Sequence, residues 1–321
     1  MKPFNVGIIG LGGMGRIMLA DMLKHEKFAV LAVWDRDDAA CELVRSQNPG
    51  LRIASDARGL IHGDSVDLLY VATPPNTHRE YFLAAIEAGV SMLCEKPFGV
   101  DVAESRDLLE RIETAGLPNI INFNHGNALG SAQIEKQLQG GAIGEVVGVD
   151  VLIHLTRWPR DFQQKATWLA GREQGGFTRE MLSHWLYLTR RLLGEGTISH
   201  AHVTYPDDGM SSETSLLAEL DFGGIPCFIK AAIGGVGPVG TQYTTWGSKK
   251  SYRLYSGSRI SSSDGGDWIE EFTDIEDIGD GDRQRNLDGV AARLTGAPST
   301  MPDAADGFAV QQLIEALLAT R

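Results

Sequence analysis

A glycine-rich turn near the N-terminus is the feature that most restricts the fold of this 321-residue chain. Within the sequence GIIGLGGMG, Gly10, Gly12 and Gly15 form the pattern G-x-G-x-x-G. The pattern follows an apolar run over 4–9 and opens an amphipathic stretch over 14–25, so it falls where a buried strand passes into a helix. Glycines here permit a tight turn, close approach of a pyrophosphate to the backbone, and close packing of helix on strand. The turn therefore predicts a dinucleotide-binding βαβ unit.

The same alternation of strand and helix continues through the first third of the chain. Further apolar runs bounded by Gly, Pro or Asp predict strands at 29–34, 68–72, 90–94 and 120–123. Amphipathic stretches between them predict helices at 37–46, 76–88 and 101–115. This order is typical of a parallel sheet covered on both faces. We expect an α/β fold whose residues 1–123 form a Rossmann dinucleotide-binding domain.

The pattern changes after about residue 125. A helix is predicted at 127–139, a long strand at 145–157, a helix at 178–193, and repeated β patterns with turn signals over 197–271. These elements predict a second, α+β domain over 124–301 with a large, mostly antiparallel open sheet. The segment 302–321 is expected to form a C-terminal helix that packs back on the body of the protein.

Composition excludes several classes of partner. The net charge of −13 argues against nucleic acid or an anionic membrane surface as the main partner. No stretch approaches the length of a membrane span, and the N-terminus lacks the long apolar region of a signal peptide. Three dispersed cysteines suit a reducing cytoplasm. His200 and His202 share a strand face without a nearby Cys or acidic cluster, so no metal site is predicted.

An acidic residue at the end of the second strand bears on the choice of cofactor. Asp35 lies twenty residues after Gly15, where a carboxylate accepts hydrogen bonds from the adenosine ribose hydroxyls and repels a 2′-phosphate. This favours NAD over NADP. The neighbouring Arg36 keeps NADP open, because a guanidinium can pair with a 2′-phosphate or stack on adenine.

Two further motifs indicate a family. The fourth predicted strand ends in ATPPNTH (72–78) and the fifth in CEKPF (94–98). Together with the glycine turn, these motifs resemble the glucose–fructose oxidoreductase, inositol dehydrogenase and rhizopine-catabolism family. The resemblance continues through GAIGEV, QGGFTREMLSH and DGFAVQQ, and so extends over nearly the whole chain.

The resemblance implies an NAD(P)-dependent oxidoreductase that transfers a hydride between nicotinamide and a CH–OH carbon of a sugar, polyol or sugar acid. It implies that Lys96 reaches the nicotinamide ribose and the reacting hydroxyl, and that the Lys96–Pro97 peptide is cis. The residues expected to hold the cofactor are Gly10, Gly12, Gly13, Met14, Gly15, Asp35, Arg36, Thr73, Pro74, Asn76, His78, Glu95 and Lys96. Among them, His78 carries an alternative, since a histidine in the first turn of a helix more often packs or caps.

A carboxylate and an imidazole lie four residues apart in the QGGFTREMLSH segment. Glu180 and His184 would share one face of a helix, where they could orient and tune each other for acid–base chemistry. The alternative is a structural pair on a partly exposed helix. The resemblance favours catalysis, with His184 as general acid or base and Lys96 on the same proton path. The family usually has Asp where this chain has Glu180, so the longer side chain is assigned an orienting role.

Substrate contacts carry less support from the resemblance. Many relatives have an Arg-Arg-aromatic run where this chain has Asn124 and His125, so those arginine contacts cannot be transferred. The candidates for the substrate site are Asn124, His125, Arg157, Trp158 and Arg160. With Arg172 and Arg179, the arginines could clamp a carboxylate or phosphate, or could form ion pairs at an acidic surface.

Two alternatives to a dehydrogenase remain open from the sequence. Relatives include glycosidases that oxidise transiently and eliminate with NAD kept bound, and a cofactor-sensing regulator shares the fold. The presence of Lys96, Glu180 and His184 together favours an enzyme. The open second sheet predicts a homodimer or homotetramer formed through that sheet, since its far face otherwise lacks a cover. The expected partner is thus a small carbohydrate-like substrate, besides further copies of the chain.

Overall fold

The computed structural model describes residues 2–63, 65–255 and 258–320. The chain divides into two compact units. The first comprises 1–123 and 286–309, and the second comprises 124–285 and 310–321. The second domain is predicted to end at 301, whereas in the structure the segment 286–309 belongs to the first unit.

The first unit is built on a parallel sheet. Its strands are β1 (Phe4–Ile9), β2 (Phe28–Trp34), β3 (Arg52–Ile53), β4 (Leu68–Val71), β5 (Ser91–Cys94) and β6 (Asn119–Ile121). They lie in the order β3-β2-β1-β4-β5-β6, as the Rossmann prediction requires. Only β3 was not predicted, because its two residues are too few to show a pattern. The order reverses between β1 and β4, and in open α/β sheets ligands bind beyond the carboxyl ends of the strands at such a point.

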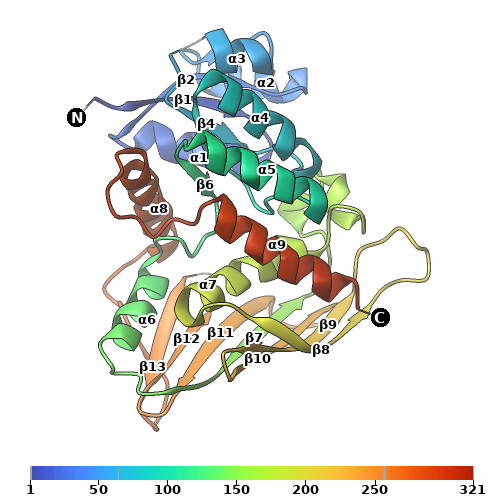
Figure 1. Cartoon of the computed structure of the whole chain (residues 1–321), viewed down its shortest axis with the longest axis vertical. Helices are drawn as coiled ribbons and strands as arrows, with labels where there is room; N and C mark the ends of the chain where they lie inside the picture. The colour runs from blue at the N-terminus through green and yellow to red at the C-terminus, as the bar shows by residue number, and fades with distance from the viewer. Residues whose placement is uncertain (1, 64, 256–257, 321) are drawn as a thin grey trace. The chain divides into compact units, whose positions relative to one another are not determined.

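Helices cover this sheet. They are α1 (Gly13–Lys24), α2 (Asp38–Gln47), α3 (Ala57–Gly63), α4 (His78–Ala88) and α5 (Val102–Ala115). Figure 1 shows α4 and α5 lying side by side. A further helix, α8 (Ile278–Leu294), was not predicted, because its sequence is polar and contains three glycines. Leu287, Val290 and Ala291 of α8 nevertheless enter the core around Val6 and Ile8 of β1.

The second unit is built on an eight-stranded sheet. Its strands are β7 (Val146–Leu155), β8 (Thr197–Thr204), β9 (Ser215–Phe222), β10 (Ile225–Ile233), β11 (Gly240–Gly247), β12 (Ser251–Tyr255), β13 (Arg259–Ser263) and β14 (Ile269–Glu270). They lie in the order β14-β13-β12-β11-β7-β10-β9-β8. Among the described strands, β7 and β10 pair in parallel and the other neighbours are antiparallel. The prediction of a mostly antiparallel sheet is confirmed.

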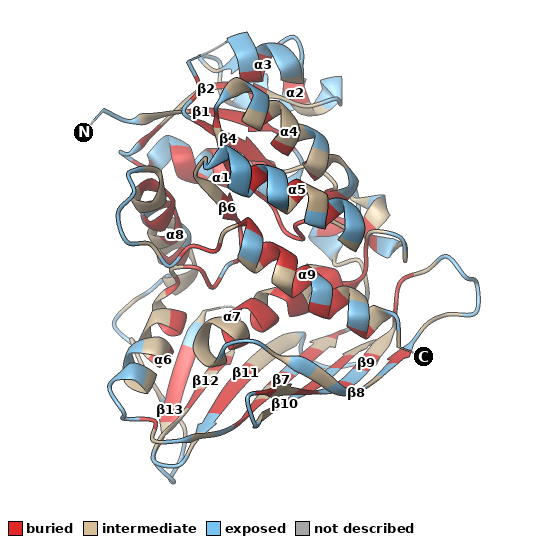
Figure 2. Cartoon of the chain, in the orientation of Figure 1, coloured by how far each residue is buried: buried red, intermediate tan, exposed pale blue. Residues whose placement is uncertain are grey.

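The two faces of this sheet differ in cover. The helices α6 (Leu129–Gln139) and α7 (Ser183–Leu193) pack on one face, where the Trp185 ring of α7 stacks on Tyr243 of β11 at 5.5 Å between centroids. Buried and exposed residues alternate along the strands, as Figure 2 shows. On the other face, Leu152, Leu217 and Phe228 are exposed on the neighbouring strands β7, β9 and β10. The cross-strand neighbours of these three residues are Lys230, Asp150 and Glu219, so this face mixes apolar side chains with charged ones.

The C-terminal helix α9 (Ala304–Leu318) contributes residues to both units. In the first unit, the Ala304 N–H donates to the Asn119 side chain at 2.7 Å. In the second, the Leu318 carbonyl accepts from the Tyr205 hydroxyl at 3.0 Å. Its side chains Val310, Leu313, Ile314 and Leu317 are buried.

Candidate active site

The motifs of the first unit meet at one edge of its sheet because their strands end in register. Ile9 of β1 pairs with Val71 of β4, and Val71 pairs with Cys94 of β5. The residues that follow, Gly10 and Glu95 among them, leave the sheet at the same level. The glycine turn, the ATPPNTH motif and the CEKPF motif are therefore neighbours, as expected for the carboxyl edge of a parallel sheet.

The glycines of the turn serve two different purposes. Gly10 has φ +95°, and a Cβ there would lie 2.4 Å from the Ala72 carbonyl oxygen. A Cβ on Gly15 would lie 1.9 Å from the Gly10 carbonyl oxygen, so these two glycines are required by the packing of the backbone itself. A Cβ on Gly12 or Gly13 would have no atom within 4 Å, so these two face open space.

That open space fits the pyrophosphate of a dinucleotide. Gly12 precedes the first turn of α1 and makes no side-chain cap, so the N–H groups of that turn and the positive end of the helix dipole are available to an anion. Met14 lies beside them and is exposed. The carboxylate of Asp35 is fixed nearby, since it accepts the Leu11 N–H at 2.6 Å and the Asp37 N–H at 2.8 Å. The partly exposed Asp35 and the exposed Arg36 lie where the sequence analysis places the adenosine ribose.

The ATPPNTH loop continues from β4 into a short 3₁₀ turn, Pro75–Thr77, and then α4. Thr73 and Pro74 are partly exposed and Asn76 is exposed, so all three are accessible to a ligand. The Thr77 hydroxyl donates to the Thr73 hydroxyl at 2.7 Å.

His78 plays a different part from the one predicted. It is completely buried, with Nε2 2.9 Å from the Thr73 carbonyl oxygen and Nδ1 3.0 Å from the Pro97 carbonyl oxygen. Burial lowers its pKa to about 4 and outweighs the carbonyl contacts, which raise it, so the ring is neutral at ordinary pH and donates to one of the two carbonyls. A side chain with no exposed surface cannot touch a cofactor. The expectation of a cofactor contact is therefore wrong, and His78 instead ties the loop after β4 to the loop after β5.

The CEKPF motif places two charged residues in the interior. Glu95 is 6 % exposed, and its Oε1 accepts from the Tyr70 hydroxyl and from the Asn122 amide, both at 2.7 Å. Lys96 is 8 % exposed, and its peptide bond to Pro97 is cis, as the resemblance implies. Burial and the Glu95 charge raise the pKa of Tyr70 well above its ordinary value, which keeps that hydroxyl a donor.

Sequence reasoning missed Tyr70 and Asn122. Asn122 directly follows β6, so the rule that ligand-site residues lie at the carboxyl ends of strands could have found it. Tyr70 lies inside the apolar strand β4, where no pattern distinguishes it from a core aromatic.

The second unit carries the other candidate residues, beginning with Glu180. The predicted helix over 178–193 is helical, but it opens with a π-helical segment, Thr178–Leu182, before α7 begins at Ser183. Glu180 lies in that segment, and π turns occur often at functional sites. Its Oε1 accepts from Gln163 Nε2 at 2.9 Å and from Arg160 Nη2 at 3.4 Å. Gln163 is buried in the arginine-rich loop and was not predicted.

His184 lies in the first turn of α7 and its ring is held from two sides. Its Nδ1 accepts the backbone N–H of Asn124 at 3.2 Å. The ring of His125 lies edge-on to it at 6.5 Å between centroids and packs on Trp185 at 4.3 Å. His125 Nδ1 lies 3.1 Å from the Ser131 hydroxyl.

The same contacts distinguish His125 from Asn124 as substrate candidates. His125 is buried, and burial together with the Arg191 charge lowers its pKa to about 3, so its ring stays neutral. It supports His184 from within the protein. Asn124, in contrast, is exposed beside His184 and is accessible to a substrate.

The arginines around the expected pocket do not form one anion clamp. Arg179 is buried in a bidentate pair with Glu315, with both contacts at 2.7 Å. Arg172 packs over the Tyr205 ring at 3.9 Å, and the exposed Arg157 pairs with Asp161. These three fit the alternative of structural ion pairs and packing.

Arg160 differs from the other arginines because it contacts a candidate catalytic group. Its guanidinium lies 4.7 Å from the centroid of the Phe162 ring and 6.0 Å from that of Trp158, besides its contact with Glu180. Burial lowers the pKa of Arg160, and the Glu180 charge opposes that effect. Trp158 is itself engaged, since its indole N–H donates to the Leu169 carbonyl at 2.8 Å.

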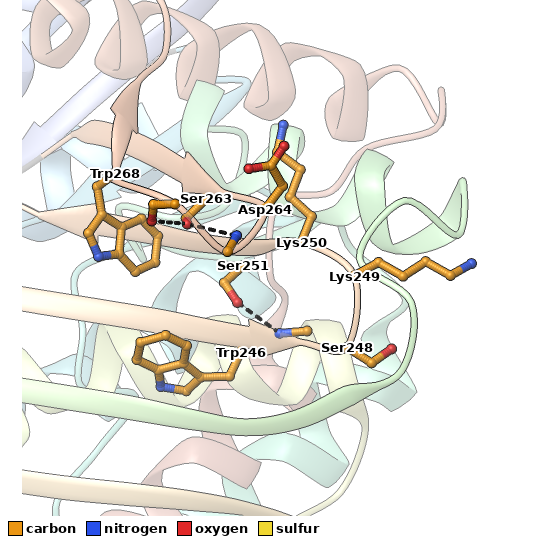
Figure 3. A pocket seen from close by; sticks show the side chains of 11 residues that line it. Trp246, Ser248, Lys249, Lys250, Ser251, Ser263, Asp264 and Trp268 are labelled. Carbon is orange, nitrogen blue, oxygen red and sulfur yellow. Dashed lines mark hydrogen bonds between the residues drawn. The ribbon is translucent and has the colours of Figure 1, made fainter.

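A separate cavity of about 320 Å³ lies at the turns that join β11 to β12 and β13 to β14. Figure 3 shows the indoles of Trp246 and Trp268 on one side of it and the side chains of Lys249 and Asp264 on the other. The indole N–H of Trp246 donates to the Asp150 carboxylate at 2.7 Å. Asp150 lies on one face of the sheet, and Tyr243, on which Trp185 stacks, lies on the opposite face. This cavity contains none of the predicted site residues.

Within residues 2–63, 65–255 and 258–320, no three His, Cys, Asp or Glu side chains are grouped as metal ligands would be. Across these same ranges, no helix combines the length and the apolar character that crossing a membrane requires.

Comparison with known proteins agrees with this arrangement. Over 212 residues, the chain is 26% identical to levoglucosan dehydrogenase from Pseudarthrobacter phenanthrenivorans, covering 61% of this chain and 52% of that protein. Over 207 residues, it is 30% identical to inositol 2-dehydrogenase from Paracoccus denitrificans, covering 63% of this chain and 57% of that protein. The matched part thus spans about half the length of these relatives.

Solved structures extend the likeness in fold to the whole chain. A crystal structure of an oxidoreductase from Agrobacterium radiobacter, in complex with NAD⁺, L-tartaric acid and magnesium, superposes with a TM-score of 0.83 at 19% identity. It covers 98% of this chain and 94% of that one. Residues 4–123 match the oxidoreductase family's NAD-binding Rossmann fold, and residues 135–320 match its C-terminal alpha/beta domain. The chain therefore belongs to the glucose–fructose oxidoreductase, inositol dehydrogenase and rhizopine-catabolism family of NAD-binding oxidoreductases.

Proposed function

We propose that this protein is a dehydrogenase that transfers a hydride between nicotinamide and a CH–OH carbon of a sugar, polyol or sugar acid. The observation that carries the proposal is the buried Lys96, which follows β5 at the sheet edge that also bears the glycine turn. Burying an ammonium group costs free energy unless the group is paired or hydrogen-bonded. Ligands of open α/β sheets bind at the strand ends of this edge, so a binding site accounts for a buried charge there. Lys96 is thus the group best suited to hold or move the proton of a substrate hydroxyl.

The substrate class follows from the relatives. Those named levoglucosan dehydrogenase and inositol 2-dehydrogenase act, by their names, on a sugar derivative and a cyclic polyol. The exposed Asn124 beside His184 supplies polar groups suited to hydroxyls. The proposed substrates include sugar acids, because the Arg160 guanidinium lies 3.4 Å from the carboxylate of Glu180. A cation close to this candidate catalytic group suits a substrate that carries a carboxylate.

Bound nicotinamide supplies the hydride acceptor or donor, and the chain determines which cofactor binds. We propose NAD, because the fixed Asp35 carboxylate offers acceptors to ribose hydroxyls and repels a 2′-phosphate. Cofactor binding measured by calorimetry with NAD and NADP tests this choice. An NADP affinity equal to or above that for NAD would contradict it.

The proposed activity is tested by nicotinamide absorbance with sugars, inositols, other polyols and sugar acids, each with NAD and with NADP. Two variants accompany the wild type: Lys96→Met, and Lys24→Met as a matched control at an exposed lysine of the same unit. Turnover that disappears in Lys96→Met and persists in Lys24→Met supports the proposal. Absence of turnover on every substrate, with cofactor still bound, would sink it and favour the glycosidase or the regulator.

We further propose that the protein self-associates through the far face of the second sheet and works in the cytoplasm. On that face Lys230 is flanked by the exposed Leu152 and Leu217 on the adjacent strands, and Phe228 is flanked by Glu219 and Asp150. Apolar and oppositely charged side chains in one patch suit pairing with a second copy. Light scattering after size exclusion should give a dimer or tetramer for wild type and a smaller species for Phe228→Lys. A wild-type monomer would contradict this proposal.

A further inference from the structure

We propose that the cavity between the β11–β12 turn and the β13–β14 turn is a second ligand site, which binds a sugar ring of a saccharide against Trp246 and Trp268. The site is separate from the candidate active site. The helix α7, which carries His184, packs on one face of the sheet. Trp246 and its partner Asp150 lie on the opposite face, so the sheet itself stands between the two sites. The second site therefore stands whether or not the protein is a dehydrogenase.

Two indole rings form an apolar wall of the cavity, and both are held in place. Their centroids lie 5.8 Å apart and their planes meet at 60°. The Trp246 N–H donates to the Asp150 carboxylate at 2.7 Å, and the Arg253 guanidinium lies 4.4 Å from the centroid of the Trp268 ring. Trp246 is nevertheless 38 % exposed, so part of its ring is open to a ligand. The fold thus keeps a fixed aromatic corner at the protein surface.

The angle between the rings and the size of the cavity select the ligand. Rings at 60° do not present the parallel faces between which a flat nucleobase would stack. A pyranose is puckered and carries C–H groups on more than one side, so it can bury apolar surface against both indoles. The cavity of about 320 Å³ is at the lower end of the range for small-molecule sites, about 300–1,000 Å³. A saccharide of one or two rings is therefore favoured over a nucleotide.

The other wall of the cavity supplies hydrogen-bonding groups for hydroxyls. Lys249 and Asp264, which Figure 3 shows apart from the indoles, are both exposed. An ammonium group donates and a carboxylate accepts, so together they suit the hydroxyls of one sugar ring. The turn after β13 is preformed, since the Ser263 hydroxyl donates to the Gly266 carbonyl at 2.7 Å and accepts the Gly265 N–H at 3.2 Å. Little conformational freedom is lost when a ligand enters a site of this kind.

Fluorine spectroscopy of the full chain tests the site directly. The chain has six tryptophans, and incorporation of 5-fluorotryptophan gives a ¹⁹F signal for each of them. The variants Trp246→Phe and Trp268→Phe identify the two signals of the corner. Titration with methyl glucosides, cellobiose and maltose should shift these two signals, whereas sorbitol, an acyclic polyol without a ring face, should not. The proposal is wrong if no saccharide shifts either signal, or if sorbitol shifts them equally.

Two further variants show whether both walls contribute. Trp246→Ala should weaken saccharide binding, followed at the Trp268 signal, by at least about tenfold, which is usual when a tryptophan that anchors a contact is truncated. Asp264→Ala should weaken it by about three- to tenfold, the effect of one hydrogen bond, without endangering the fold because Asp264 is exposed. Asp207→Ala, at another exposed carboxylate of the same unit, is the matched control and should bind as the wild type does. Wild-type affinity in both Trp246→Ala and Asp264→Ala would refute the site.

A second copy of the chain is the competing occupant, because the patch proposed for self-association lies on β7, β9 and β10, and β7 adjoins β11. Dilution of the protein without saccharide distinguishes the two. Signals of Trp246 and Trp268 that move with protein concentration and respond to no saccharide would show that a second copy covers the corner, and would overturn the proposal. Hydride transfer, once a substrate is known, should be unchanged in Asp264→Ala, and its loss there would contradict the separation of the two sites.

Discussion

Replacing Gly15 by alanine should destabilise the first unit, whereas the same replacement at Gly12 should spare the fold and impair cofactor binding. The added methyl at Gly15 would lie 1.9 Å from the Gly10 carbonyl oxygen, where ordinary contact begins at 3.4 Å. The obstacle is the backbone carbonyl of Gly10, so the start of α1 and the glycine turn must separate by about 1.5 Å, the difference between 3.4 and 1.9 Å. At Gly12 the methyl meets no atom within 4 Å.

The magnitudes follow from these contacts. Overpacking costs about 1–3 kcal/mol, and an immovable carbonyl places Gly15→Ala at the upper end, near 3 kcal/mol. A loss of 1 kcal/mol lowers Tm by about 2–4 °C in a domain of roughly this size, so a fall of about 6–12 °C is expected. Gly12→Ala changes only a helix cap, worth about 1 kcal/mol or less. Its methyl occupies the space proposed for the pyrophosphate, so affinity for NAD should fall at least about tenfold, or about 1.4 kcal/mol.

Thermal unfolding by circular dichroism without cofactor gives the first quantity, and titration calorimetry with NAD gives the second. A Gly15→Ala variant with the same Tm as the wild type would contradict the predicted clash between α1 and the Gly10 carbonyl. The assignment of the pyrophosphate site fails if Gly12→Ala binds NAD with wild-type affinity while its Tm is unchanged. A matched pair of this kind separates the role of a glycine in the fold from its role in binding.

Two further predictions concern stability. The folded state holds the pKa of His78 at about 4 against an ordinary 6.5, so the unfolded chain binds the proton first and stability falls as pH drops from 6.5 toward 4. At about 1.4 kcal/mol per pH unit, this group lowers the free energy of unfolding by about 3 kcal/mol over that range. Urea unfolding measured at several pH values should show that the free energy of unfolding depends less steeply on pH in His78→Gln than in the wild type. An equally steep dependence in the variant contradicts the assignment. Arg179→Met leaves the Glu315 carboxylate without its bidentate partner and should lower the free energy of unfolding by about 3 kcal/mol. This is the lower end of the range for a buried pair, because Glu315 is partly exposed. The double variant Arg179→Met/Glu315→Leu should recover most of that loss in the same assay, and no recovery would show that Arg179 stabilises through its bonds to backbone carbonyls instead.

The elements that the sequence predicts well are those with local signals. The strand β1 was predicted at its observed bounds. Glycine is required at Gly10 by the Ala72 carbonyl, one strand away, and at Gly15 by the Gly10 carbonyl, within the motif itself. The cis peptide at Lys96–Pro97 was implied by the resemblance and is present. The strand and the glycine turn depend on a local apolar pattern and on sterics around the motif, which a sequence displays directly.

The features that the sequence misses depend on partners far along the chain. Arg179 looks like part of an anion site, but its partner Glu315 lies 136 residues away. His78 was expected near the cofactor, but its ring is buried and contacts the Pro97 carbonyl, which lies 19 residues further along the chain. The π-helical segment at Thr178–Leu182 leaves no mark in the apolar pattern, because Leu182 is buried there as an α-helix would also allow.

The candidate catalytic residues of the second unit show what spacing alone leaves out. A separation of four residues suggested that Glu180 and His184 tune each other. In the structure, Glu180 accepts from Gln163 and Arg160, and His184 accepts from the Asn124 backbone. These contacts of each group thus come from residues outside the i, i+4 pair, and a helical spacing cannot show partners that lie elsewhere along the chain.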